Sequence, residues 1–99
     1  MTRTIAIQQR KGGATKSTTA AEVTLALARA GKRVLAIDLD EARALSVRMG
    51  FGAYDVPEMT SLDLLDGAEA TACTVESPAI PGVDVIQGDP AWMRCQTWP

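Results

Sequence analysis

Residues 11–18 carry the sequence Lys11-Gly12-Gly13-Ala14-Thr15-Lys16-Ser17-Thr18. This stretch lies between a β-branched apolar run, Thr4–Gln8, and a following segment of helical composition. Adjacent glycines let backbone N–H groups converge on an anion, and the N-terminus of a helix adds partial positive charge. The stretch therefore predicts a phosphate-binding loop, in which Lys16 neutralises the outer phosphates and Ser17 gives its hydroxyl to Mg²⁺. A plain strand-to-helix connection is the alternative.

The segments around this loop predict a βαβ unit. After the loop, apolar residues recur at the spacing of a helix, at Ala20, Val23, Leu27 and Ala30. Gly31 is the expected C-cap of this helix. A second continuous apolar run over residues 34–37 is typical of a buried parallel strand, and it ends at Asp38.

The second half of the chain predicts two short helices and a third strand. One helix is expected from Glu41 to Met49, and the other has Ser61 as its N-cap and stops at Gly67. An irregular acidic segment then precedes a strand over residues 83–86. Strands that alternate with helices predict an α/β fold, with residues 1–99 forming a single domain whose parallel sheet is flanked by helices.

The loop departs from the usual G-x-x-x-x-G-K-[ST] pattern, because Arg10 and Thr15 hold its two glycine positions. It matches instead the deviant Walker A form K-G-G-x-x-K-[ST]-T, and on these residues the chain resembles the N-terminal portion of the ParA/MinD family of P-loop ATPases. The resemblance runs from Thr4 to near Asp89 and implies an incomplete Rossmann-like P-loop sheet with ATP and Mg²⁺ as cofactors. It assigns nucleotide binding to Lys11, Gly12, Gly13, Ala14, Thr15, Lys16, Ser17 and Thr18.

Two carboxylates, Asp38 and Asp40, follow the second predicted strand, at the end of a sheet where α/β folds bind ligands. The resemblance implies that Asp40 positions the attacking water and that Asp38 serves the metal side or supports the loop. Capping of the strand end and the next helix is the alternative role. The family usually continues with Pro-Gln-Gly after this pair, whereas this chain has Glu41-Ala42-Arg43. The candidate catalytic residues are Lys11, Lys16 and Asp40, and the candidate metal ligands are Ser17 and Asp38.

The family likeness implies ATP-dependent plasmid partition, chromosome segregation or cargo positioning. In the family, the lysine at the place of Lys11 reaches the phosphates bound by the partner in an ATP-sandwich dimer. A homodimer, or pairing with a longer homologous ATPase, is therefore expected. A partition adaptor protein and non-specific DNA are the further partners that the resemblance implies. No apolar strand ending in Asp follows Ile86, so the Walker B aspartate is not placed and hydrolysis stays open. A non-catalytic truncated regulator of a full-length ATPase, or another deviant-Walker ATPase such as an iron–sulfur cluster carrier, is the alternative.

Composition and charge bear on three further questions: the ligands the chain binds, its location in the cell and the role of its cysteines. Of the chain's 10 Lys and Arg residues, nine lie in residues 1–50, and eight of its 12 Asp and Glu residues lie in residues 51–99. The basic first half indicates either affinity for phosphate or nucleic acid, or a clustering there of loop lysines and helix-end arginines. Because no run approaches the roughly 20 apolar residues of a membrane span and no signal peptide is recognisable, a cytoplasmic protein is expected. Cys73 and Cys95, in a chain without His, are expected to be ordinary thiols.

Overall fold

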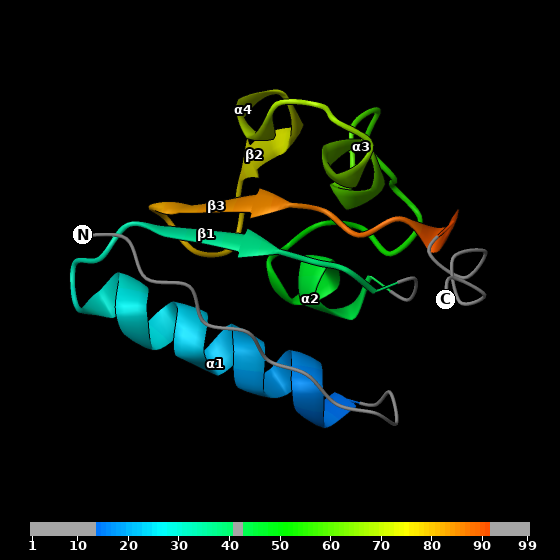
Figure 1. Ribbon diagram of the computed structural model, residues 1–99. Coiled ribbons are helices and arrows are strands. Elements are labelled where there is room, and N and C mark those ends of the chain that lie inside the picture. The colour runs from blue at the N-terminus through cyan, green and yellow to red at the C-terminus, as the bar shows by residue number, and fades with distance from the viewer. Residues whose placement is uncertain (1–13, 41–42, 92–99) are drawn as a thin grey trace.

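The computed structural model describes residues 14–40 and 43–91, in which a three-stranded sheet lies between two groups of helices (Figure 1). In chain order the elements are α1 (Ala14–Arg29), β1 (Val34–Ile37), α2 (Ala44–Arg48), α3 (Ser61–Leu65), α4 (Ala70–Cys73), β2 (Thr74–Glu76) and β3 (Val83–Ile86). Helices α1 and α2 lie on one side of the sheet, and α3 and α4 lie on the other side. The predicted α/β class is confirmed, and the expected strand Thr4–Gln8 lies outside the described residues.

The described sheet has the order β1-β3-β2. Strands β1 and β3 pair in parallel, with Val34 opposite Val83 and Ile37 opposite Ile86. Strand β2 pairs with β3 in the antiparallel direction, so the sheet is mixed and the prediction of a parallel sheet is right for β1 and β3 alone. The segment that contains α4 and β2 was expected to be irregular, which is wrong. Since β1 and β3 run in the same direction, their carboxyl ends meet at one edge of the sheet.

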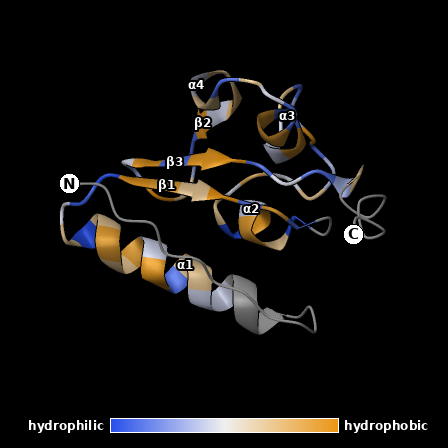
Figure 2. Cartoon of the chain, viewed as in Figure 1, coloured by the Kyte–Doolittle hydropathy of each residue, from blue (hydrophilic) through white to orange (hydrophobic). Residues whose placement is uncertain are grey.

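The core lies between the sheet and the layer formed by α1 and α2. Its buried residues are Ala36, Met49, Val83 and Val85. Partly buried apolar side chains surround them: Ala21, Ala28, Val34, Leu45, Phe51 and Ile80. Strand β1 is hydrophobic along its whole length (Figure 2), whereas β3 carries the exposed Asp84 among its apolar residues. Burial of this apolar surface holds α1 against the sheet.

Strand β1 is less buried than its apolar sequence predicts. Leu35 is 46% exposed and Ile37 is 42% exposed, whereas Ala36 between them is buried. The reason is that Leu35 and Ile37 lie on the opposite face of the strand from Ala36, which belongs to the core beside α1 and α2, whereas β3 lies between two strands and buries Val83, Val85 and Ile86.

Helix α1 buries a slightly different stripe from the predicted one. Ala30 is exposed, whereas Thr24 is buried and Ala21 and Ala28 pack against the core. Thr24 tolerates burial because its Oγ1 donates a hydrogen bond to the carbonyl of Ala20 at 2.8 Å. The stripe prediction is therefore partly wrong, since it excluded a polar residue that satisfies itself within the helix.

The helix ends follow the turn chemistry of the sequence, with two corrections. Gly31 has φ +82°, and the Gly31 N–H donates to the Ala28 carbonyl at 3.0 Å, which confirms the predicted C-cap. Helix α2 begins at Ala44, later than expected, after Arg43 at φ 56°. The N-cap of α3 is Thr60, because its Oγ1 accepts the Leu62 N–H, and Ser61 is the first helical residue. Among the described helices, none is long and apolar enough to cross a membrane.

Candidate functional site

The N-terminal end of α1 and the carboxyl ends of β1 and β3 face the same side of the molecule, which we call the carboxyl edge (Figure 1). Helix α1 begins at Ala14, so residues 14–18 of the predicted phosphate loop form its first turns. Lys11, Gly12 and Gly13 lie outside the described residues. The first N–H groups of this 16-residue helix, which have no partner within the helix, therefore face the edge where Asp38 and Asp40 follow β1.

Asp38 is 3% exposed and both of its carboxylate oxygens accept hydrogen bonds. Its Oδ1 accepts the Asp40 N–H at 3.1 Å, and its Oδ2 accepts the Ser46 N–H at 3.0 Å and the Ser46 hydroxyl at 2.7 Å. Asp38 thus fastens the start of α2 to the end of β1. These contacts are those of a carboxylate that supports a loop.

Asp40 is only partly buried. Its carbonyl accepts the backbone N–H of Arg43 at 3.2 Å, and within residues 14–40 and 43–91 its carboxylate accepts no hydrogen bond. Of the two aspartates, Asp40 is the one whose side chain is not occupied by the surrounding fold in the described part of the chain.

Gly88 packs directly against this aspartate pair. A Cβ added to Gly88 would lie 2.6 Å from the carbonyl oxygen of Asp40 and 3.0 Å from the Cγ of Asp38. The Gly88 N–H donates to the Oγ of Ser46 at 3.0 Å. The segment after β3 therefore approaches the segment after β1 at a distance that only glycine permits.

Arg43 is the most enclosed charged side chain of the edge, with 1% exposure. Its Nε donates to the Gly88 carbonyl at 2.9 Å, and one terminal nitrogen donates to the carbonyls of Gly52 and Ala53 at 2.6 and 3.0 Å. The other terminal nitrogen donates to the Gln87 side-chain oxygen at 2.5 Å and to the Asp55 carbonyl at 3.4 Å. All five N–H groups are thus used, and every acceptor is uncharged.

Comparison with known proteins identifies the family. A family model described as "AAA domain" matches residues 2–96. The chain is 38% identical to "Chromosome partitioning protein ParA" of Caulobacter vibrioides over 87 residues, which are 88% of this chain and 32% of that protein. It is 35% identical to "Chromosome-partitioning ATPase Soj" of Thermus thermophilus over 98 residues, covering 93% of this chain and 39% of the relative. "Sporulation initiation inhibitor protein Soj" of Bacillus subtilis is 33% identical over 86 residues, covering 87% of this chain and 34% of the relative.

The chain belongs to the ParA/MinD family. It spans about a third of the length of the curated relatives it matches. The backbone at Arg43 is left-handed, with φ 56°, a conformation that suits glycine.

The segment after β3, which Arg43 and Ser46 hold at Gly88, is also held by hydrogen bonds from the start of α3. The Ser61 N–H donates to the Gln87 carbonyl at 2.8 Å, and the Thr60 hydroxyl donates to the Asp89 carboxylate at 2.9 Å. Asp63 completes a capping box, because its Oδ2 accepts the Thr60 N–H at 2.7 Å. The segment 87–89 is therefore fixed between α2 and α3.

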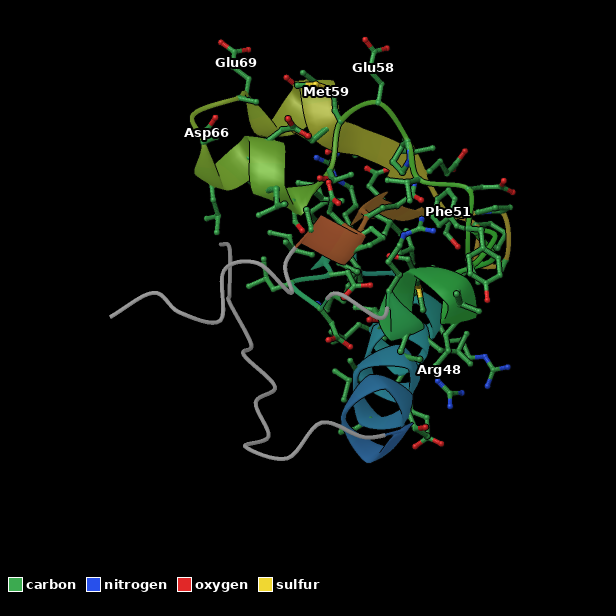
Figure 3. The ribbon with its side chains drawn as sticks, turned by 90° about the vertical axis from the view of Figure 1, so that its right-hand side faces the viewer. Arg48, Phe51, Glu58, Met59, Asp66 and Glu69 are labelled. Atoms are coloured by element: carbon green, nitrogen blue, oxygen red, sulfur yellow. The ribbon has the colours of Figure 1, made fainter. Side chains whose placement is uncertain are left out.

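Three exposed acidic residues, Glu58, Asp66 and Glu69, lie away from the N-terminus of α1. Figure 3 looks onto the carboxyl edge, with α1 at the bottom, and shows Glu58, Asp66 and Glu69 extending outward at the top, whereas Arg48 extends outward beside α1. This separation keeps these carboxylates apart from the end of α1 that favours anions.

The described residues bring some of the predicted site together and add residues that the sequence reasoning missed. Asp38 and Asp40 lie at the edge toward which residues 14–18 point. Gly88 and Arg43 were missed, although a glycine close to the end of a strand is a signal for close backbone approach. Within residues 14–40 and 43–91, no three His, Cys, Asp or Glu side chains gather as a metal site, and Cys73 is a free buried thiol.

Proposed function

We propose that this chain binds ATP and Mg²⁺ at the carboxyl edge and acts in partition as a ParA-type P-loop ATPase. The observation that carries the proposal is the position of α1, whose first turns contain residues 14–18 and face the edge where Asp38 and Asp40 leave β1. Helix N-termini bind phosphate through their free N–H groups and their dipole. The relatives whose names refer to chromosome partitioning support partition over the iron–sulfur carrier alternative.

Each residue of the loop has a role in this proposal. Backbone N–H groups from Gly12 to Thr18 bind phosphate oxygens, Lys16 neutralises their charge, and Ser17 gives its hydroxyl to Mg²⁺. When bound, Mg²⁺-ATP supplies the γ-phosphoryl group that is transferred to water. Lys11 acts on the phosphates of a partner subunit. The N-terminus of α1 suits an anionic ligand, because its first N–H groups and the helix dipole favour negative charge, and Glu58, Asp66 and Glu69 extend away from it.

The two aspartates, Asp38 and Asp40, have different roles in this proposal. Asp40 holds the attacking water, since its carboxylate accepts no hydrogen bond from the described residues. Asp38 supports the loop through Ser46 and the Asp40 N–H, and its place beside the metal is a further role that the proposal retains. Positioning and charge neutralisation, rather than covalent chemistry, supply the catalysis.

The proposed partners are a second copy of this chain or a longer homologous ATPase, paired across ATP, together with a partition adaptor protein and non-specific DNA. Pairing through Lys11 requires two nucleotide-bound subunits. Light scattering with and without Mg²⁺-ATP therefore tests it, with nucleotide-dependent doubling of mass as the expected result.

Calorimetry with Mg²⁺-ATP tests nucleotide binding. The wild-type chain and Lys32→Ala, which removes an exposed lysine beyond the far end of α1, are expected to bind equally. Lys16→Ala is expected to weaken binding by about tenfold or more, because a phosphate-bound lysine makes charge-assisted contacts. Equal affinity of Lys16→Ala and wild type, or no binding by a folded wild-type chain, contradicts the proposal. Binding without phosphate release would favour the non-catalytic regulator.

A further inference from the structure

Arg43 is buried in a setting that is costly for an arginine. Its guanidinium is 1% exposed and, within the described residues, hydrogen-bonds to no carboxylate. A buried charge is tolerated only when its hydrogen bonds are complete. The residue also stands at φ 56°, where a glycine would carry neither the charge nor the strain. The contacts of the guanidinium therefore have to offset both costs.

Those contacts join three parts of the chain that are distant in sequence. The terminal nitrogens bind the carbonyls of residues 52, 53 and 55 and the side chain of Gln87, and Nε binds the Gly88 carbonyl. The planar fork of arginine suits this task, because its five N–H groups have fixed directions. The loop 52–55 thus becomes a support from which the segment 87–88 is held.

From Gly88 the constraint passes to Asp40. The Gly88 Cα lies against the Asp40 carbonyl, since a Cβ there would be 2.6 Å from that oxygen. The same carbonyl accepts the Arg43 N–H at 3.2 Å. Asp40 is therefore held by the backbone of Arg43 and, through Gly88, by its guanidinium.

We propose that Arg43 is a positioning residue for Asp40. It holds the backbone of Asp40, from which the Asp40 carboxylate extends at the carboxyl edge. The inference deepens the proposed function and rests on it for the role of Asp40 toward nucleotide, whereas the mechanical link from Arg43 through Gly88 to Asp40 is tested without nucleotide.

Amide hydrogen exchange measured by NMR tests the link. The reporters are the Asp40 N–H, bonded to Asp38, and the Gly88 N–H, bonded to Ser46, each taken relative to the core amide of Val85. Arg43→Lys and Arg43→Gly are expected to raise both relative rates about tenfold or more, because local opening no longer has to break the guanidinium contacts. The matched control Arg48→Lys changes an exposed arginine of α2 and should leave them unchanged.

Two further readouts keep the inference falsifiable if a variant fails to fold. In the wild-type chain, the Arg43 Nε–H is expected to exchange slowly, and rapid exchange there would overturn the inference. Where either Arg43 variant folds, unchanged relative rates at Asp40 and Gly88 would also overturn it.

A titration with Mg²⁺-ATP separates this inference from the proposed function. In wild type the amides of Gly12 and Gly13 and the carboxyl carbon of Asp40 should all shift. In Arg43→Gly the two glycine amides should still shift, while the response of Asp40 falls by about half or more, which a loss of overall stability alone would not produce. An identical Asp40 response in both proteins refutes the inference and leaves nucleotide binding intact. No shift at all in wild type refutes nucleotide binding, and the exchange rates still decide the link.

Discussion

Gly88→Ala is the substitution whose cost follows most directly from the structure. The new Cβ would lie 2.6 Å from the Asp40 carbonyl oxygen and 3.0 Å from the Cγ and Oδ2 of Asp38. Carbon–oxygen contacts normally begin near about 3.3 Å, so the two segments have to separate by roughly 0.7 Å. Neither neighbour yields easily, because one is backbone and the other is a buried carboxylate that holds three hydrogen bonds.

The magnitude combines three contributions. Overpacking against rigid atoms costs about 1–3 kcal/mol. Weakening of the bond from the Gly88 N–H to Ser46 costs about 1 kcal/mol more. Alanine lowers the conformational entropy of the unfolded chain relative to glycine, which stabilises the folded state by roughly 0.4–1 kcal/mol. We therefore expect Gly88→Ala to lower the free energy of unfolding by about 2 kcal/mol, which corresponds to a fall in Tm of roughly 8–16 °C for a chain of this size.

Gly52→Ala is the matched control for urea unfolding monitored by circular dichroism. Its added Cβ would also meet a neighbour closely, but that neighbour is the exposed side chain of Asp55, which can rotate away. Gly52→Ala should stay within about 0.5 kcal/mol of wild type, as surface substitutions usually do. Equal stability of the two variants, or Gly88→Ala within that same margin of wild type, would refute the close approach of the two strand ends.

Three other predictions concern side chains around the edge and the core. Ser46→Ala leaves the Gly88 N–H without its acceptor and removes a donor from Asp38, so urea unfolding should show a loss of about 2 kcal/mol, and a loss below a quarter of that would contradict the network. Thr60→Ala removes the N-cap of α3 and should cost about 1 kcal/mol in the same assay, against no change for the exposed Thr71→Ala. With the other cysteine replaced by serine, Cys73 should react with iodoacetamide about 100-fold more slowly in the folded chain than in urea, and equal rates would show that it is exposed.

Sequence reasoning succeeded where one local signal was strong. The segment 83–86, predicted from its apolar residues, is β3, and Gly31 is the C-cap of α1, because each depends on a few adjacent residues. Strand β2 was missed since Thr74-Val75-Glu76 is short, lies at the edge of the sheet and is half exposed, so it shows no apolar run. Its pairing with β3 is a tertiary effect.

The candidate site was predictable only in part, for a physical reason. Asp38 and Asp40 stand at a strand end, which a sequence reveals. From the sequence, Arg43 is predicted to lie on the surface, because charged side chains are rarely buried. Its burial depends on carbonyl groups from residues up to 45 positions away, which converge only after β1 and β3 have paired.

The two buried charged side chains of the edge, Asp38 and Arg43, satisfy each other indirectly. Gly88 connects them, because its N–H donates to the Ser46 hydroxyl, which donates to Asp38, while its carbonyl accepts from Arg43. Each of these three hydrogen bonds has its donor on the guanidinium side and its acceptor on the carboxylate side. These hydrogen bonds through Gly88 hold the ends of β1 and β3 in register. They leave the neighbouring Asp40 carboxylate without a hydrogen bond from the described residues, and the water-positioning role proposed for Asp40 requires such an unoccupied carboxylate.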